Sequence, residues 1–280
     1  MPQFNNPHHP QPSSLLALIN SAYKNRQLII QMIRREVVGR YKGSIFGLAW
    51  SFLNPILMLI IYTFVFSVVF KSRWGSTGSE SKAEFALILF VGMIVFGIFS
   101  EAINRAPSLI IANTNYVKKV VFPLEILPII SFGAVFFHAL VSFGVLLLAA
   151  LLFNGSINWT VIFLPLILLP LVLLTLGISW LIASLGVYLR DVGQTVSLLT
   201  SLLMFLSPVF YPVSAVPARF QIWLMLNPLS FMIEQARGVV IFGSQPNWFG
   251  LAIYFAASLI VVKLGFGWFQ KTRKGFADVL

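Results

Sequence analysis

The sequence predicts an all-α integral membrane protein with six transmembrane helices. Of its 280 residues, 58% are hydrophobic and only 10% are charged, and the charged residues fall mostly between long apolar runs. A soluble domain carries about a quarter of its residues as charged side chains. An apolar run of about 20 residues is long enough for a helix to cross a bilayer. We therefore expect lipid to surround most of this chain.

Six apolar runs give the predicted spans. They cover residues 47–70, 85–100, 126–153, 161–187, 196–213 and 248–269. The first is about 36 Å long as a helix, enough to cross with some tilt. The second is short and reaches Ile103 only by including Glu101. Residues 47–270 thus form the predicted transmembrane domain, and residues 271–280 a cytoplasmic tail.

The distribution of Lys and Arg predicts the orientation of these spans. Thirteen of the 19 basic residues fall on one side: Lys24, Arg26, Arg34, Arg35, Arg40, Lys42, Arg105, Lys118, Lys119, Arg190, Lys271, Arg273 and Lys274. Five fall on the other: Lys71, Arg73, Lys82, Arg219 and Arg237. Cytoplasmic loops are enriched in basic residues, so both termini are predicted in the cytoplasm. Basic residues in cytoplasmic loops, where anionic lipid headgroups attract them, explain the net charge of +11. The charge therefore does not indicate a nucleic-acid partner.

The stretch 220–240 is apolar enough to resemble a seventh span. It contains the dipeptide Asn227-Pro228 and the charges Glu234 and Arg237. Each charge at mid-bilayer would cost roughly 2.5–3.5 kcal/mol, and a seventh crossing would place the basic C-terminal segment outside. We therefore predict two short re-entrant helices on the outer side, between spans five and six.

The N-terminal region divides into two parts. Residues 1–14 are polar and proline-rich without an apolar core, which predicts a disordered tail rather than a cleaved signal peptide. His8 and His9 in this tail lack the further ligands that a metal site needs. Residues 15–46 are predicted to form a cytoplasmic interfacial amphipathic helix.

Helical periodicity supports the interfacial helix over residues 26–42. One face carries Ile29, Ile33, Val37 and Tyr41, with Ile30 beside them; the opposite face carries Gln27, Gln31, Arg34 and Arg35. Arg26 and Arg40 lie at the ends of the apolar stripe and are expected to extend their charged groups toward water. The alternative is a solvated basic stretch with no membrane contact.

Residue types typical of catalytic sites are scarce. The chain has no cysteine and no GxxxxGK[ST] loop, so it holds no thiolate site and cannot bind nucleotide in the P-loop manner. His138 lies within an apolar run, where it is expected to satisfy a local hydrogen bond. Glu101 precedes Arg105 by four residues and is expected to form a helix-surface ion pair with it. Lys263 lies near the end of its span, from which its side chain can reach the interface.

Aromatic side chains form a further pattern. Tyr62, Phe66 and Phe70 recur every four residues in the first span, and Phe205, Phe210 and Tyr211 cluster near the outer end of the fifth. Such faces suit a sugar chain that slides past without being held tightly. They equally suit helix packing, lipid contact or an interfacial aromatic belt. The sequence leaves both readings open.

Four segments together resemble the membrane subunits of ABC-2-type polysaccharide exporters, the family of O-antigen, capsule and teichoic-acid permeases. These segments are RYKGSIFGLAWSFLNPI at 40–56, NTNYVKKVVFPLEILP at 113–128, RDVGQ at 190–194, and residues 207–238, which contain SPVFYPVSAVP and LNPLSFMIEQARG. The proline-rich N-terminus and the loop KSRWGSTGSESKAE at 71–84 have no counterpart in this pattern.

The resemblance implies a transporter subunit without catalysis or bound cofactor of its own. Two copies would form a channel in the bacterial cytoplasmic (inner) membrane, and two copies of a separate P-loop ATPase would bind ATP and Mg²⁺. The cargo would be a lipid-linked polysaccharide, O-antigen above all. Alternatives are a drug or small-lipid efflux permease of the same superfamily, a proton-driven flippase, and a membrane transferase. The scarcity of acids and histidines argues against the last two.

The resemblance also implies roles for particular residues. Coupling to the ATPase would involve Asn113, Asn115, Tyr116, Lys118, Lys119, Phe122, Pro123, Arg190 and Asp191. The interfacial helix would add Arg34, Arg35, Arg40, Tyr41 and Lys42 as a second contact. Asn227, Pro228, Glu234 and Arg237 would belong to an outer gate, with Glu234 and Arg237 as an ion pair. Headgroup binding is the alternative role for Lys118 and Lys119.

Overall fold

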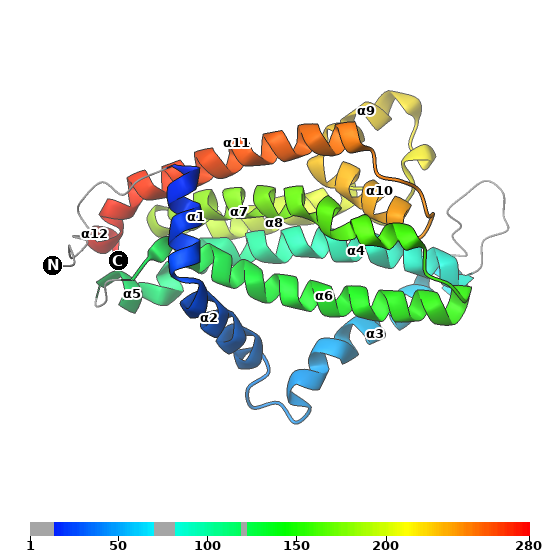
Figure 1. The fold of residues 1–280 in the computed structure, drawn as a ribbon, viewed down its shortest axis with the longest axis horizontal. Coiled ribbons are helices and arrows are strands. Elements are labelled where there is room, and N and C mark those ends of the chain that lie inside the picture. The colour runs from blue at the N-terminus through cyan, green and yellow to red at the C-terminus, as the bar shows by residue number, and fades with distance from the viewer. Residues whose placement is uncertain (1–13, 70–81, 119–121) are drawn as a thin grey trace.

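The computed structural model describes residues 14–69, 82–118 and 122–280 of the chain (Figure 1). These residues are helical and include no β-strand, and five of the helical stretches are long and apolar enough to cross a membrane. This confirms the predicted all-α membrane class. The predictions for His8, His9, Phe70 and Lys119 lie outside the described residues.

The helices follow one another along the chain with short connections. They are α1 Leu15–Lys24, α2 Arg26–Gly39, α3 Trp50–Tyr62, α4 Lys82–Arg105, α5 Thr114–Lys118, α6 Leu127–Asn154, α7 Leu164–Tyr188, α8 Val192–Leu206, α9 Ala218–Leu226, α10 Pro228–Val240, α11 Trp248–Thr272 and α12 Phe276–Val279. Single 3₁₀ turns are η1 Gly47–Ala49, η3 Ala106–Ser108, η4 Ile111–Asn113, η5 Leu124–Ile126, η6 Trp159–Phe163, η7 Val213–Ala215 and η8 Arg273–Gly275. The π-helical segment η2, Thr63–Val69, continues α3.

Five of the six predicted spans correspond to long apolar helices. These are Gly47–Phe66, Ala83–Ser108, Leu124–Asn154, Trp159–Tyr188 and Trp248–Val279. The remaining predicted span, 196–213, coincides only in part with α8, which has 15 residues and ends at Leu206. Pro208 cannot continue a helix, and it favours the extended backbone found at Ser207. A crossing at α8 therefore stays a prediction.

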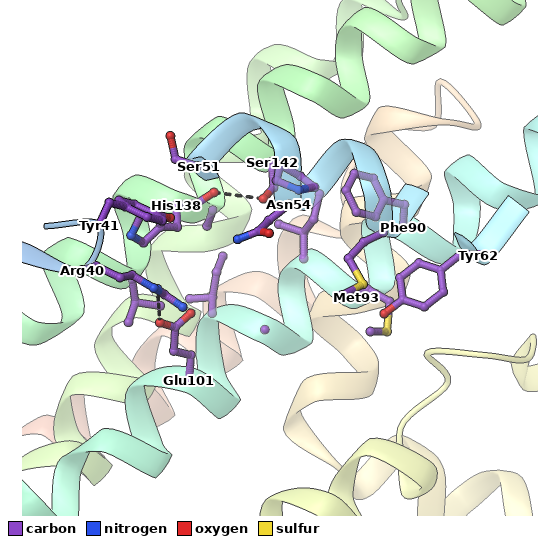
Figure 2. Close-up of a pocket in the computed structure, with 17 residues that line it drawn as sticks. Arg40, Tyr41, Ser51, Asn54, Tyr62, Phe90, Met93, Glu101, His138 and Ser142 are labelled. Atoms are coloured by element: carbon purple, nitrogen blue, oxygen red, sulfur yellow. Dashed lines mark hydrogen bonds and ion pairs between the residues drawn. The ribbon is translucent and has the colours of Figure 1, made fainter. Parts of the chain in front are cut away.

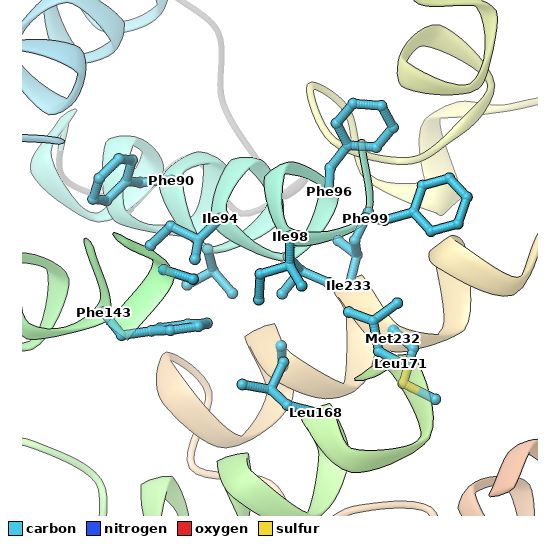
Figure 3. Close-up of a cluster of buried hydrophobic side chains, with 14 of the residues drawn as sticks. Phe90, Ile94, Phe96, Ile98, Phe99, Phe143, Leu168, Leu171, Met232 and Ile233 are labelled. Carbon is cyan, nitrogen blue, oxygen red and sulfur yellow. The ribbon is translucent and has the colours of Figure 1, made fainter. Parts of the chain in front are cut away.

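Helix α4 is the centre of the bundle. It packs against α6, α7, α8 and α10, and most of its residues are buried. A helix enclosed by protein on several sides can be apolar nearly all round. Figure 3 shows its side chains meeting those of α6, α7 and α10 in the largest buried cluster, which includes Phe90, Ile94, Phe96, Ile98, Phe99, Phe143, Leu168, Leu171, Met232 and Ile233. By contrast, α3 is mostly exposed within this single chain.

Helices α7 and α11 approach each other at a pair of glycines. A Cβ atom added to Gly265 would lie 1.9 Å from the carbonyl oxygen of Gly177, so only the missing side chain permits this contact. Small residues let helix backbones pack closely in membranes, where the hydrophobic effect does not hold helices together. The α7–α11 contact therefore depends on these two positions.

The Gly265→Val variant is expected to lose about 1–3 kcal/mol of stability, since the two backbones must separate. The measurement is the thermal unfolding of detergent-purified protein. Gly267→Val is the matched control, because it lies on the same helix and its added Cβ would meet no atom within 4 Å. Equal melting temperatures for the two variants would contradict the glycine contact.

The stretch 220–240 forms two short helices, as predicted. The break falls at Asn227, whose side chain accepts a hydrogen bond from the backbone N–H of Leu229 at 3.0 Å and so caps α10. Its amide also donates to the Ser207 hydroxyl at 2.9 Å. Pro228 occupies the first turn of α10, where its missing N–H costs nothing. How deep the two helices lie in a membrane stays a prediction.

The region predicted as one interfacial helix, residues 15–46, contains two helices, α1 and α2, and its location at a membrane interface stays a prediction. Ile29 and Val37 are buried, Ile33 packs at Gly133 of α6, and the predicted polar side chains are exposed. The predicted end of the helix was wrong, because α2 ends at Gly39, before Arg40 and Tyr41. Met32 is buried on the face that meets α6, and Ile30 is 64% exposed in the single chain.

The ends of the described chain lie at one end of the bundle. Figure 1 shows α1, α5 and α12 there, and α9 and α10 at the opposite end. Residues 271–280, counted in the sequence as a tail, include η8 and α12. Phe276 in α12 is fully buried and contacts Phe269 and Tyr188 by its ring. This segment is therefore part of the folded bundle.

Candidate functional site

Four charged side chains join the interfacial helix to the central helix α4. Arg105 Nη1 lies 2.6 Å from Glu36 Oε1, and Arg40 Nη1 lies 2.7 Å from Glu101 Oε1. The predicted Glu101–Arg105 pair is confirmed at 3.3 Å, but Glu101 is shared between two arginines. Burial raises the pKa of Glu36, and the nearby Arg105 opposes this shift. These pairs lie where α4 extends past Glu101, beyond the end of the apolar run.

A cavity of about 230 Å³ lies beside this cluster, between the end of α2 and helices α3, α4 and α6. Figure 2 shows Arg40, Tyr41, Asn54, Glu101 and His138 around its polar end. The opposite end is lined by apolar and aromatic side chains, namely Pro55, Met58, Tyr62, Phe90, Met93 and Ile94. The cavity is thus amphipathic, and the predicted channel residue Tyr62 lines it.

His138 is only partly satisfied by its neighbours. Its Nδ1 lies 3.5 Å from the Tyr41 hydroxyl, at the limit of a hydrogen bond, and the two rings meet edge to face. Its Nε2 is buried and has no hydrogen-bond partner among residues 14–69, 82–118 and 122–280. The expected local hydrogen bond therefore accounts for one ring nitrogen only.

The predicted aromatic stripe divides into packed and open positions. Phe66 stacks on Phe210 with ring centroids 5.7 Å apart, which joins η2, the continuation of α3, to the residues that follow α8. Tyr211 donates to the carbonyl of Phe205 at 2.8 Å. Phe205 itself is 67% exposed. Phe66 and Phe210 thus support the packing interpretation. Tyr62 packs in part against the buried clusters and lines the cavity, and Phe205 is mostly exposed although its ring lies 6.3 Å from that of Phe210.

The segment predicted to couple to an ATPase is folded against the interfacial helix. Tyr116 stacks on Phe122 at 4.4 Å and accepts a hydrogen bond from Arg35 Nη2 at 3.1 Å. Asn113 donates to the Leu109 carbonyl. Most of the predicted docking residues are exposed, namely Asn115, Lys118, Arg34 and Lys42, together with Arg190 and Asp191 in the turn between α7 and α8. Pro123 is half-buried. The structure therefore brings Arg35 together with the coupling segment.

A buried ion pair that the sequence did not indicate holds the start of α6. Glu125 Oε2 lies 2.6 Å from Arg273 Nη1, and both side chains are largely buried. Glu125 Oε1 accepts a hydrogen bond from the Ser21 hydroxyl of α1 at 2.8 Å, and Trp180 donates to the Glu125 carbonyl. Arg273 also donates to the carbonyl of Phe122 at 3.2 Å. The sequence signal that could have pointed to Glu125 was the position of this acidic residue in an apolar stretch between Pro123 and Pro128.

At the opposite end, Arg237 is fully buried and connects three parts of the chain. Its guanidinium donates to the carbonyls of Ile88 in α4 at 3.0 Å and Val209 after α8 at 2.7 Å. It also donates to Pro208, and the predicted pair with Glu234 is confirmed at 2.8 Å. Gly92 makes room for it, since a Cβ there would lie 2.5 Å from Nη2.

The family of the chain follows from its sequence match. The profile of the ABC-2 type transporter family matches residues 27–242, from α2 to just beyond α10. The chain belongs to this family. The matched region of this ABC-2 transporter chain contains the ion-pair cluster, the amphipathic cavity, the coupling segment and Arg237, whereas α1, α11, α12 and Arg273 lie outside it.

Relatives of this ABC-2 chain match it over almost their full length. It is 26% identical to the O-antigen export system permease protein RfbA of Myxococcus xanthus, over 94% of this chain and 99% of the relative. It is 27% identical to a protein of the same name from Klebsiella pneumoniae, over 90% and 95%. The polysialic acid transport protein KpsM of Escherichia coli is 24% identical over 89% and 95%.

Proposed function

We propose that this chain is the permease subunit of an ATP-driven exporter that moves a lipid-linked polysaccharide, O-antigen above all, across the bacterial cytoplasmic membrane. Near full-length similarity to permeases named for O-antigen export and polysialic acid transport carries this proposal. Relatives with these names favour a glycan cargo over a drug or a small lipid. The chain itself is a transport subunit and not an enzyme.

In this proposal the chain crosses the membrane six times, with α8 and the residues after it as the fifth crossing. Helix α8 spans only about 22 Å, so the segment up to residue 213 would complete the passage. The placement of α1 and α12 at one end of the bundle, opposite α9 and α10, supports an even number of crossings (Figure 1). The basic residues at that end favour the cytoplasm.

A separate P-loop ATPase would dock at the same end, through α5 and α2, and would bind ATP and Mg²⁺. The exposed Asn115 and Lys118 offer polar contacts there. The Arg35–Tyr116 hydrogen bond and the Tyr116–Phe122 stack connect α5 to α2 and to the start of α6. A rigid-body movement of the ATPase would therefore reach a membrane-spanning helix through packed side chains.

Recovery of the ATPase with the tagged chain from native membranes tests this function. Lys118→Glu is expected to reduce the recovered ATPase about tenfold, because reversing a charge at a docking surface introduces repulsion. Lys271→Glu is the control, since it is also an exposed lysine at this end of the bundle. Failure of the unaltered chain to recover any P-loop ATPase would overturn the proposed function. Equal recovery with both variants would leave headgroup binding as the role of Lys118.

Two copies of the chain would form the channel. Helix α3 is largely exposed in the single chain, and α8 exposes Leu198, Leu199, Leu202 and Phe205. A second copy that covers part of these faces would place Tyr62 and Phe205 along the path of the glycan.

The Tyr62→Ala/Phe205→Ala variant is expected to reduce surface polysaccharide severalfold, since it removes two large aromatic faces that would contact the sugar. The measurement is an immunoblot of surface glycan at matched expression. Phe249→Ala on α11 is the control, because Phe249 is 78% exposed and lies far along the chain from α3 and α8. Export equal to that of the control would favour helix packing or lipid contact for both residues.

A further inference from the structure

We infer that helix α11 carries a binding site for an anionic phospholipid of the bilayer, formed on its exposed face by Lys263, Gly267, Trp268 and Lys271. The lipid phosphate would lie between the two ammonium groups, over the bare backbone of Gly267, and the acyl chains would follow the apolar part of the same face. This inference needs only that α11 crosses the membrane, and it is independent of the cargo and of the partner ATPase.

Helix α11 lies at the edge of the bundle and leaves one face uncovered (Figure 1). It packs mainly against α7, which it meets at Gly265. Lys263 and Gly267 lie two residues on either side of Gly265, so helical geometry places them on the face turned away from α7. Ile260 and Lys271 are exposed on that same face. Because the dimer proposed above uses α3 and α8, lipid is the expected neighbour of this face.

Two tryptophans place this face relative to the bilayer. Trp248 and Trp268 are both exposed on α11 and lie 20 residues apart, which is about 30 Å along a helix and equals the thickness of the hydrocarbon core. Tryptophan is enriched at both membrane interfaces. With one ring at each interface, Lys263 lies about 7.5 Å inside the hydrocarbon core and Lys271 about 4.5 Å beyond it.

The ammonium group of Lys263 lacks a counter-charge at this depth. Its side chain forms no ion pair with any residue in the described parts of the chain. A helical side chain leaves the backbone toward the helix N-terminus, which for α11 is the direction away from the nearer interface. The ammonium therefore reaches that interface only by bending back over the next turn, where Gly267 lies. An unpaired charge in lipid is costly, so a bound anion at this point is favoured.

Gly267 leaves the space that a headgroup needs. A Cβ atom added there would meet no atom within 4 Å, so the helix surface between the two lysines is bare backbone. Lys263 and Lys271 lie one turn before and one turn after it on the same face, so both ammonium groups can reach this space. A phosphate between them would neutralise both cations, and the exposed indole N–H of Trp268 can donate to the same headgroup. The arrangement therefore favours an anionic over a zwitterionic lipid.

Quenching of a fluorophore beside this site by doxyl-labelled phospholipids tests the inference. The chain contains no cysteine, so Leu264→Cys gives a single labelling position in the full chain, reconstituted in liposomes. Doxyl-labelled phosphatidylglycerol is expected to bind there at least about threefold more tightly than doxyl-labelled phosphatidylcholine, because each lysine attracts anionic headgroups. The Lys263→Gln/Lys271→Gln variant is expected to bring this ratio to about one. Lys274→Gln is the matched control, since Lys274 is an exposed lysine at the same end of the bundle.

A further variant separates this site from a general attraction of anionic lipid to the basic end of the bundle. Gly267→Leu keeps both lysines but fills the space between their ammonium groups, so it is expected to lower the preference for phosphatidylglycerol at least twofold. Loss of the preference in the double variant and in Gly267→Leu, with its retention in Lys274→Gln, supports the site. Equal binding of the two lipids by the unaltered chain overturns it, as does a preference that persists in the double variant. If the double variant does not fold, Gly267→Leu decides in the same way.

Discussion

Replacing Arg237 by Met is expected to lower the free energy of unfolding by about 3–5 kcal/mol. The carbonyls of Ile88, Pro208 and Val209 would each lose a buried donor, and each such loss costs about 1–3 kcal/mol. The Glu234 partner adds less, because its carboxylate is 38% exposed and water can replace the guanidinium. Thermal unfolding of the purified protein in detergent measures the change.

Two further variants make the Arg237 result specific. Arg219→Met removes an exposed arginine from α9, where it lies over the Phe220 ring, and is expected to change the melting temperature little. Arg237→Lys keeps the charge but cannot reach carbonyls in several directions at once, so it is expected to recover only part of the loss. Equal melting of Arg237→Met and Arg219→Met would contradict the structural role of Arg237.

The position of Arg237 also limits how an outer gate could work. Its guanidinium connects α10 to α4 and to the residues that follow α8. If α10 moves while glycan passes, it must either carry residues 208–209 with it or leave buried carbonyls without donors. The first movement costs less, so we expect α10 and the end of α8 to move as one unit.

The sequence predicted those features of the fold that depend on neighbouring residues. Long apolar runs located five membrane helices, and Asn227-Pro228 located the break between α9 and α10. The ends of elements were less predictable, because partners distant in sequence determine them. Helix α4 continues past Glu101, whose carboxylate pairs with Arg40, a residue 61 positions away in the sequence.

The same distinction holds for the candidate site. Glu101 and Arg105 are four residues apart, so helical spacing predicted their ion pair. The pair Glu234–Arg237 was expected from the resemblance to polysaccharide exporters. Glu125 and Arg273 are 148 residues apart, and no local pattern joins them. The burial of Met32 was not predicted, since periodicity defines an apolar stripe but not which part of it packs against α6.

The Arg273→Met variant is expected to lose about 3–5 kcal/mol of stability, because it leaves the buried Glu125 carboxylate without its counter-charge. The loss should also weaken ATPase recovery, since Arg273 holds the carbonyl of Phe122, whose ring stacks on Tyr116 in the coupling segment. Thermal unfolding and recovery of the ATPase from native membranes measure the two effects separately.

A double variant distinguishes the ion pair from simple side-chain packing. Adding Glu125→Gln to Arg273→Met removes the unpaired charge, while the amide can still accept the hydrogen bond from Ser21. It is therefore expected to recover part of the lost stability, whereas Lys274→Met, which removes an exposed neighbouring cation, should have little effect. If the double variant is less stable than Arg273→Met alone, then Arg273 acts mainly through packing and its contact with Phe122. In that case α1 and the C-terminal segment would position the start of α6 through shape rather than charge.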